Sequence, residues 1–155
     1  MRFISGVIEK LQRHPKRIVF PEGTEPRVLL AARQFYALRL GVPILLGDPV
    51  RIQEVARDLK VALNGIRLLN PADSEELDNY ASRFRRLHQY RGKRMKMLEA
   101  RDAVLQPNYF GAMMLAMHAA DGFVAGVRQV TAGVLRPLFQ TIKPAPHSKT
   151  VASCL

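Results

Sequence analysis

The sequence predicts an α/β fold in which a sheet lies between two layers of helices. Helical and strand patterns alternate along the chain, and this alternation is typical of layered α/β proteins. The strand segments are short and apolar, as buried strands are. The composition agrees with a globular domain, since 48% of the 155 residues are hydrophobic and 24% are charged. This length suffices for one domain with a core of its own.

The predicted strands are runs of β-branched and other apolar residues, and we expect all four to share one sheet. They cover Arg17–Phe20, Val42–Leu46, Ile66–Leu69 and Gly122–Val127. The predicted helices show apolar residues three and four positions apart. They cover residues 3–13, 25–40, 94–105, 108–120 and 132–142, with two more that begin at Pro49 and at Ser74.

Residues suited to helix ends support these boundaries. Thr24 and Asp48 have side chains that can accept a hydrogen bond from the first turn of the helix that follows each. Pro49 is tolerated at a first helical position. Gly41 and Gly92 stand where two of the helices should end.

The net charge narrows the range of partners. Lys and Arg number 24 against 13 Asp and Glu, a formal charge of +11, which favours nucleic acid, acidic membrane or phosphorylated small molecules. The longest apolar run, Tyr109–Met117, is far shorter than the roughly 20 residues of a membrane span. The N-terminus shows no export signal, and Cys154 is the only cysteine, so we expect a cytoplasmic protein without disulfides.

The strongest local site candidate is the segment Gly126–Pro137, which runs from the end of a predicted strand into a helix. Ligands of open α/β sheets bind beyond the carboxyl ends of strands, and helix N-termini attract phosphate. Thr131 adds a hydroxyl group there, and Arg136 adds a forked cation that can hold phosphate. A structural alternative stays open, in which Thr131 caps the helix and Arg136 forms an ion pair.

The segment Arg83–Arg101 is a second candidate, because it holds eight Lys or Arg residues and a single acid, Glu99. A nucleic-acid-binding face has this composition, but so does a solvated helix surface. Phe84 falls on the predicted buried stripe, where it cannot stack on bases, so nucleic acid is the less favoured partner. No metal is expected, because the four His residues are scattered away from ligand spacings.

Several segments together resemble one family, the phosphate acetyl/butyryl transferases. The resemblance includes RIVFPEGTEPRVL at the first strand and helix, PILLGDP at the second strand, and three later blocks in the same order. Those blocks are NYFGAMM from Asn108, ADG from Ala120, and LRP from Leu135 followed by Gln140 and Ile142-Lys143.

The resemblance implies a fold like that of isocitrate and isopropylmalate dehydrogenases, in which two α/β domains face each other across a cleft. It also implies transfer of an acetyl group between coenzyme A and inorganic phosphate, usually by a homodimer. Acetyl-CoA, coenzyme A, acetyl phosphate and phosphate are then substrates, and no cofactor and no membrane partner are implied. A base would take the thiol proton, the thiolate would attack the acetyl phosphate carbonyl, and cations would hold the phosphate.

The resemblance assigns substrate-binding positions one by one. Arg136 matches an arginine of the family's cleft. His88 occupies the place of a second substrate-binding arginine, and Arg91, one turn later, could substitute for it. The serine, arginine and aspartate assigned to the reaction lie in a part of the family's sequence beyond residue 155.

We therefore expect residues 1–150 to form the N-terminal α/β domain and residues 151–155 to begin a strand that leads into a missing second domain. The expected function is that of a truncated phosphate acetyltransferase that is inactive alone. Two alternatives remain: a non-catalytic domain that senses acetyl-CoA or mediates interactions, and a basic nucleic-acid binder.

Overall fold

The computed structural model describes residues 2–142. They form four parallel strands in the order β3-β2-β1-β4. These strands are β1 (Lys16–Phe20), β2 (Gly41–Leu46), β3 (Arg67–Leu69) and β4 (Gly122–Phe123). Helices precede, connect and follow them: α1 (Arg2–Arg13), α2 (Pro26–Ala37), α3 (Pro49–Asp58), the 3-10 turn η1 (Pro71–Asp73), α4 (Leu77–Tyr90), α5 (Met97–Leu105), α6 (Pro107–Ala116) and α7 (Thr131–Thr141).

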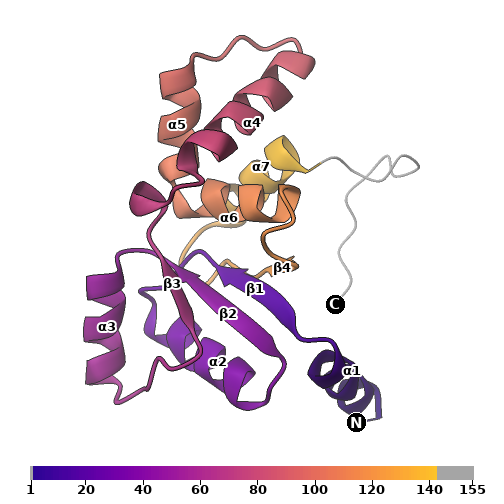
Figure 1. The fold of residues 1–155 in the computed structure, drawn as a ribbon, viewed down its shortest axis with the longest axis vertical. Coiled ribbons are helices and arrows are strands. Elements are labelled where there is room, and N and C mark those ends of the chain that lie inside the picture. The colour runs from indigo at the N-terminus through magenta and orange to yellow at the C-terminus, as the bar shows by residue number, and fades with distance from the viewer. Residues whose placement is uncertain (1, 143–155) are drawn as a thin grey trace.

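Helices cover both faces of the sheet, as Figure 1 shows, so the predicted α/β class and the single sheet are confirmed. On one face, Phe20 and Leu45 pack with the inner residues of α2 and α3. On the other, Val19, Ile44 and Leu46 pack with α4, α5 and α6. Neighbouring strand residues thus point to opposite cores, which explains why the strands read as unbroken apolar runs.

The comparison with the isocitrate dehydrogenase-like fold remains a prediction, as does the domain division at residue 150. The strand predicted to begin at residues 151–155 lies outside the described residues.

Several predicted boundaries were wrong for identifiable local reasons. Thr24 does not cap α2, because Glu25 is the N-cap residue and Pro26 begins the helix. That helix ends at Ala37 rather than residue 40, since Arg39 has a φ of 56° that no α-helix accommodates. Helix α4 begins three residues after Ser74, whose hydroxyl instead accepts a hydrogen bond from the Glu76 N–H at 3.3 Å.

By contrast, Asp48 is the N-cap of α3 as predicted, and its carboxylate accepts a hydrogen bond from the Val50 N–H at 2.9 Å.

Strand β4 lies at the edge of the sheet, and it is two residues long instead of the predicted six. It pairs with β1 through Ile18 opposite Gly122 and Val19 opposite Phe123. Just before β4, the Asp121 carboxylate accepts hydrogen bonds from the backbone N–H and the guanidinium of Arg17, at 2.8–3.0 Å. The chain leaves the sheet after this short pairing, and that departure leads to the candidate site.

Candidate functional site

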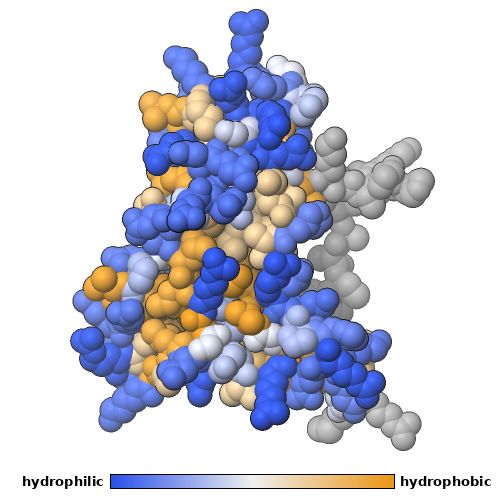
Figure 2. Space-filling model, in the orientation of Figure 1, coloured by the Kyte–Doolittle hydropathy of each residue, from blue (hydrophilic) through white to orange (hydrophobic). Residues whose placement is uncertain are grey.

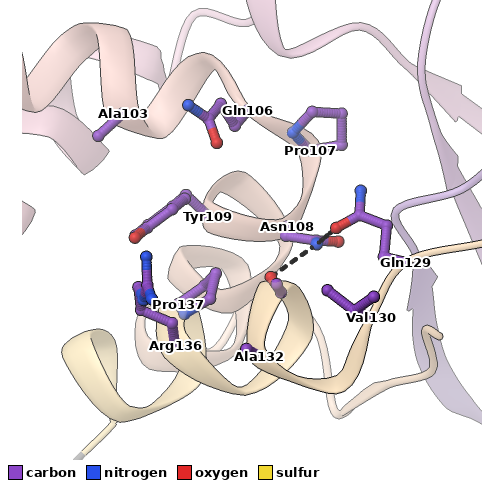
Figure 3. A pocket seen from close by; sticks show the side chains of 11 residues that line it. Ala103, Gln106, Pro107, Asn108, Tyr109, Gln129, Val130, Ala132, Arg136 and Pro137 are labelled. Atoms are coloured by element: carbon purple, nitrogen blue, oxygen red, sulfur yellow. Dashed lines mark hydrogen bonds between the residues drawn. The ribbon is translucent and has the colours of Figure 1, made fainter.

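An open cavity of about 670 Å³ lies where the start of α6 meets α7. Figure 3 shows its walls from close by: the end of α5 and the start of α6 on one side, and the loop before α7 with the first turns of α7 on the other. Its lining residues are Ala103, Gln106, Pro107, Asn108, Tyr109, Gln129, Val130, Ala132, Gly133, Arg136 and Pro137. The segment Gly126–Pro137 singled out from the sequence therefore supplies one whole wall.

Arg136 is exposed and lines this cavity. Among the ion pairs of residues 2–142, none includes its guanidinium, so the structural ion pair considered as its alternative role is not seen. Thr131 is the first residue of α7 and is exposed, but the N-cap position belongs to Val130. The capping role considered for Thr131 is therefore not seen either. Thr131 stands between two lining residues without being one of them.

Pro137 lies inside α7. Its missing N–H explains why the buried side-chain amide of Asn108 faces this helix. A proline has no backbone N–H, so the carbonyl four residues earlier loses its helical donor. That carbonyl belongs to Gly133, and the Asn108 side chain donates a hydrogen bond to it from Nδ2 at 3.0 Å. Asn108 is the second residue of α6 and is 5% exposed. A single amide therefore joins the two walls of the cavity.

The same Asn108 Nδ2 also donates to the side-chain oxygen Oε1 of Gln129, in the loop that precedes α7. Figure 3 shows Asn108 lying between Gln129 and α7, with both hydrogen bonds drawn. The other end of the amide, Oδ1, is buried and has no hydrogen-bond partner within the described residues. The loop, α6 and α7 are thus connected at one point beside the cavity.

Glu22, which follows the carboxyl end of β1, connects the loop to the sheet. Its two carboxylate oxygens accept hydrogen bonds from four consecutive backbone N–H groups, those of residues 126–129, at 2.7–3.3 Å. Partial burial raises the pKa of Glu22, but the four donors together outweigh burial, so the pKa lies below its ordinary value. Glu22 therefore binds the loop as a carboxylate at neutral pH.

His88 and Arg91 lie away from the cavity lining. His88 is 5% exposed, and its Nδ1 lies 3.2 Å from the Phe84 carbonyl oxygen. The centroids of the His88 and Phe84 rings are 4.4 Å apart. Phe84 in turn meets the edge of Tyr109, which lines the cavity. Two aromatic rings thus separate His88 from the cavity, and its substrate-binding role stays a prediction.

Arg91 is exposed, and its guanidinium donates a hydrogen bond to the Gln140 carbonyl oxygen near the end of α7, at 3.0 Å. The Tyr109 hydroxyl donates to the side chain of the same Gln140, also at 3.0 Å. Arg91 therefore contacts the last turn of α7, whereas Arg136 projects from its middle. Of the two arginines, Arg136 lines the cavity and Arg91 does not.

The basic segment Arg83–Arg101 covers the end of the α4–α5 pair, where Figure 2 shows mostly hydrophilic side chains. Phe84 is 1% exposed, as the helical pattern predicted. Within residues 2–142, no three His, Cys, Asp or Glu side chains are grouped as metal ligands, and no helix is long and apolar enough to cross a membrane.

Three residues of this region, Glu22, Asn108 and Gln129, were not predicted as site residues. Signals for two of them are present in the sequence. A proline inside the predicted helix 132–142 requires an outside donor for the Gly133 carbonyl. A carboxylate directly after the first strand lies at the sheet edge where ligands and loops gather.

These features define a class: an α/β domain with a candidate anion site beyond the carboxyl ends of its parallel strands. The sequence matches the family described as phosphate acetyl/butaryl transferase over residues 2–155. The chain belongs to this family, and the resemblance identified from the sequence blocks is confirmed.

Individual relatives agree with this assignment. The chain is 37% identical over 153 residues to the phosphate acetyltransferase of Thermoanaerobacterium thermosaccharolyticum, and 35% identical over 151 residues to that of Corynebacterium glutamicum. These matches include 99% and 97% of this chain but 45% of each relative. The chain therefore spans less than half the length of these relatives.

Solved structures show the same relation. The EutD phosphotransacetylase from Staphylococcus aureus superposes with a TM-score of 0.81 at 32% identity, over 94% of this chain and 44% of that one. A phosphotransacetylase from Streptococcus pyogenes superposes with a TM-score of 0.85 at 31% identity, over 92% and 43%.

Proposed function

We propose that this chain binds the phosphate group in an acetyl transfer between coenzyme A and inorganic phosphate. The observation that supports this proposal most directly is Arg136, an exposed guanidinium without an ion-pair partner in residues 2–142, on the wall of an open cavity. A guanidinium can hold two phosphate oxygens at once, and it keeps its charge at any physiological pH. Membership of the family supplies the reaction class.

In the proposed reaction, the coenzyme A thiolate forms a bond to the carbonyl carbon of acetyl phosphate. The bond from that carbon to the phosphate oxygen breaks, and inorganic phosphate leaves with the electron pair. Arg136 holds the phosphate and stabilises its negative charge as it departs. The proton of the thiol goes to a base.

Residues 2–142 do not place an evident base at this cavity, since Tyr109 and Arg136 are the only ionisable residues in its described lining. We therefore propose that this part of the chain binds phosphate but does not complete the transfer by itself. A second domain that closes over Arg136, and a homodimer, belong to the same proposal.

The test measures phosphate binding and acetyl phosphate formation with the purified 155-residue chain. Phosphate should bind to the wild type, and Arg136→Ala should weaken binding about 10-fold or more, because a hydrogen bond to a charged group contributes about 1.5–3 kcal/mol. Arg136→Lys should retain part of the affinity. Arg57→Ala, which removes an exposed charge from α3 on the opposite face of the sheet, is the matched control.

Equal phosphate affinity in the wild type and Arg136→Ala would refute the site. Acetyl phosphate formation by the 155-residue chain, abolished by Arg136→Ala, would show that the base lies within this chain, with His88 tested first. Binding of acetyl-CoA without turnover, even after addition of the C-terminal half of a full-length relative, would favour the sensing domain instead.

A further inference from the structure

The loop at residues 126–129 is shaped by an acidic side chain more than 100 positions earlier. Glu22 Oε2 accepts hydrogen bonds from the N–H groups of Gly126 and Val127, both at 2.9 Å. Its Oε1 accepts from Arg128 at 2.7 Å and from Gln129 at 3.3 Å. Four successive N–H groups that converge on one point form an anion-binding concavity, and here a carboxylate of the chain itself occupies it.

Glu22 is itself fixed to the central strands. The next residue, Gly23, donates its N–H to the Leu46 carbonyl oxygen at the end of β2, at 3.1 Å. A Cβ atom at Gly23 would lie 2.5 Å from that oxygen, so only glycine permits this approach. The turn after β1 is thus locked against β2, and the Glu22 carboxylate has a defined position at the carboxyl edge of the sheet.

The loop connects Glu22 to the residues of the candidate site. Gln129 is the last of the four donors, and its side chain accepts a hydrogen bond from Asn108, the amide that also binds the Gly133 carbonyl in α7. Gln129 is followed by Val130, the N-cap of α7, and Arg136 is the sixth residue of that helix. The start of α7 is therefore fixed at two points, by Glu22 through the backbone and by Asn108 through a side chain.

We propose that Glu22 is a positioning residue that sets the place of Arg136 by ordering the loop at residues 126–129. This inference rests on the proposed function in one respect only, the identity of the ligand that Arg136 binds. Glu22 does not line the cavity, so it acts through the loop and not on the substrate.

The acid nearest to Glu22 in the sequence already has other partners. Glu25, the next acid along the chain, is already paired with Arg27 at 2.8 Å and with Arg128 at 3.3 Å. A glutamine at position 22 would present one oxygen and one NH₂ group to four donors, so at least one donor would lose its acceptor. The backbone of Gly126 has a φ of 106°, which a residue with a side chain rarely adopts and glycine adopts readily, so glycine permits the conformation in which these N–H groups meet Glu22.

The test follows two NMR signals of the ligand-free 155-residue chain: the backbone amides of residues 126–129 and the Nε–H of Arg136. In Glu22→Gln we expect hydrogen exchange of these amides to become several-fold faster, since a hydrogen bond to a carboxylate is roughly twice as strong as one to a neutral amide oxygen. We also expect the Arg136 Nε–H signal to shift. Glu54→Gln, which removes a carboxylate of an exposed ion pair on α3, should change neither signal.

Glu22→Ala adds a rescue experiment, because it empties the anion-binding concavity. Sodium acetate should restore slow exchange and the wild-type Arg136 signal in Glu22→Ala, whereas sodium chloride at equal ionic strength should not. Acetate should not rescue Glu22→Gln, whose side chain still fills the space. If Glu22→Ala does not fold, Glu22→Gln alone decides the question.

An unchanged Arg136 signal in Glu22→Gln would overturn the positioning role, even if the loop amides exchange faster. Phosphate titration of the wild type separates the two proposals. An Arg136 signal that does not respond to phosphate contradicts the proposed function, while the ligand-free spectra still decide the role of Glu22.

Discussion

The two helical layers are built on the same sheet but are stabilised differently. The α2–α3 layer packs through a closed apolar cluster that includes Leu29, Leu45 and Ile52, each at most 1% exposed. The layer with α6 and α7 has an apolar cluster too, but its outer part joins the loop and α7 through the Asn108 amide and the Glu22 carboxylate. Burial of apolar area stabilises both layers, but on the second layer single polar groups place the loop and the start of α7.

This difference predicts different responses to mutation. The free energy of apolar burial is spread over many contacts. Truncating one buried side chain therefore lowers the free energy of unfolding without displacing a particular helix or loop. A hydrogen bond to one backbone group fixes a position, so its loss displaces an element even where the cost in stability is modest. The predictions below test this contrast, beginning with the largest effect.

The largest effect is expected from Leu29→Ala in the α2–α3 layer. Leu29 is fully buried, and truncation of a buried leucine to alanine costs about 2–5 kcal/mol. The matched substitution in the other layer is Phe139→Ala on α7, where the ring is 45% exposed and we expect about 1 kcal/mol or less. Urea unfolding of both variants measures the contrast. Similar losses for the two would mean that α7 is packed as tightly as the α2–α3 layer.

A smaller effect, about 1–3 kcal/mol, is expected from Asn108→Ala, which leaves the Gly133 carbonyl without a donor. Pro137→Ala restores a backbone N–H four residues after Gly133 and should supply that donor from within the helix. The double variant should therefore be more stable than the sum of the single effects predicts. A double-mutant cycle in urea gives the coupling energy, and strict additivity would contradict the role assigned to Asn108.

The same contrast explains what could be predicted from the sequence. The strands at Arg17–Phe20 and Val42–Leu46 and the cap at Asp48 depend on local patterns, and these predictions were confirmed. Arg136 was singled out because a loop that enters a helix after a strand is a local pattern as well, and its binding role stays a prediction. The hydrogen bonds of Glu22 join it to residues 104–107 positions away, and no pattern along one segment encodes such a pairing.

Local propensity predicted the wrong element boundary where another group of the protein bound the same backbone segment. Thr24 has a good capping side chain, but the turn that Gly23 forms against Leu46 moves the helix start to Pro26. Strand β4 was predicted to continue to Val127, yet the N–H groups of Gly126 and Val127 bind Glu22 instead of a neighbouring strand. In both places a contact distant in sequence or specific to the fold outweighs the local preference.

The smallest effect we predict is the acid sensitivity contributed by Glu22. Its pKa in the folded chain lies below the ordinary 4.5, so the folded state binds the proton less readily than the unfolded state does. Its contribution to the free energy of unfolding is therefore complete above pH 4.5, decreases as the pH falls below that value, and is lost below the folded pKa. In Glu22→Gln, the free energy of unfolding should fall less steeply below pH 4.5 than in the wild type. Above pH 6, the two curves of unfolding free energy against pH should run parallel.

Asp121 provides the comparison for this pH experiment. Hydrogen bonds from the Arg17 guanidinium and backbone N–H hold the pKa of Asp121 well below its ordinary 3.8. Its contribution therefore begins to decrease at a lower pH than that of Glu22, because the ordinary pKa of Asp121 is 3.8 and that of Glu22 is 4.5. Asp121→Asn should flatten the curve only below about pH 4. Stability measured by urea unfolding between pH 2 and 7 distinguishes the two windows. If Glu22→Gln and the wild type lose stability in parallel from pH 5 downward, the four loop N–H groups do not hold a carboxylate at position 22. Of the two polar contacts that fix the start of α7, only the one from Asn108 would then remain.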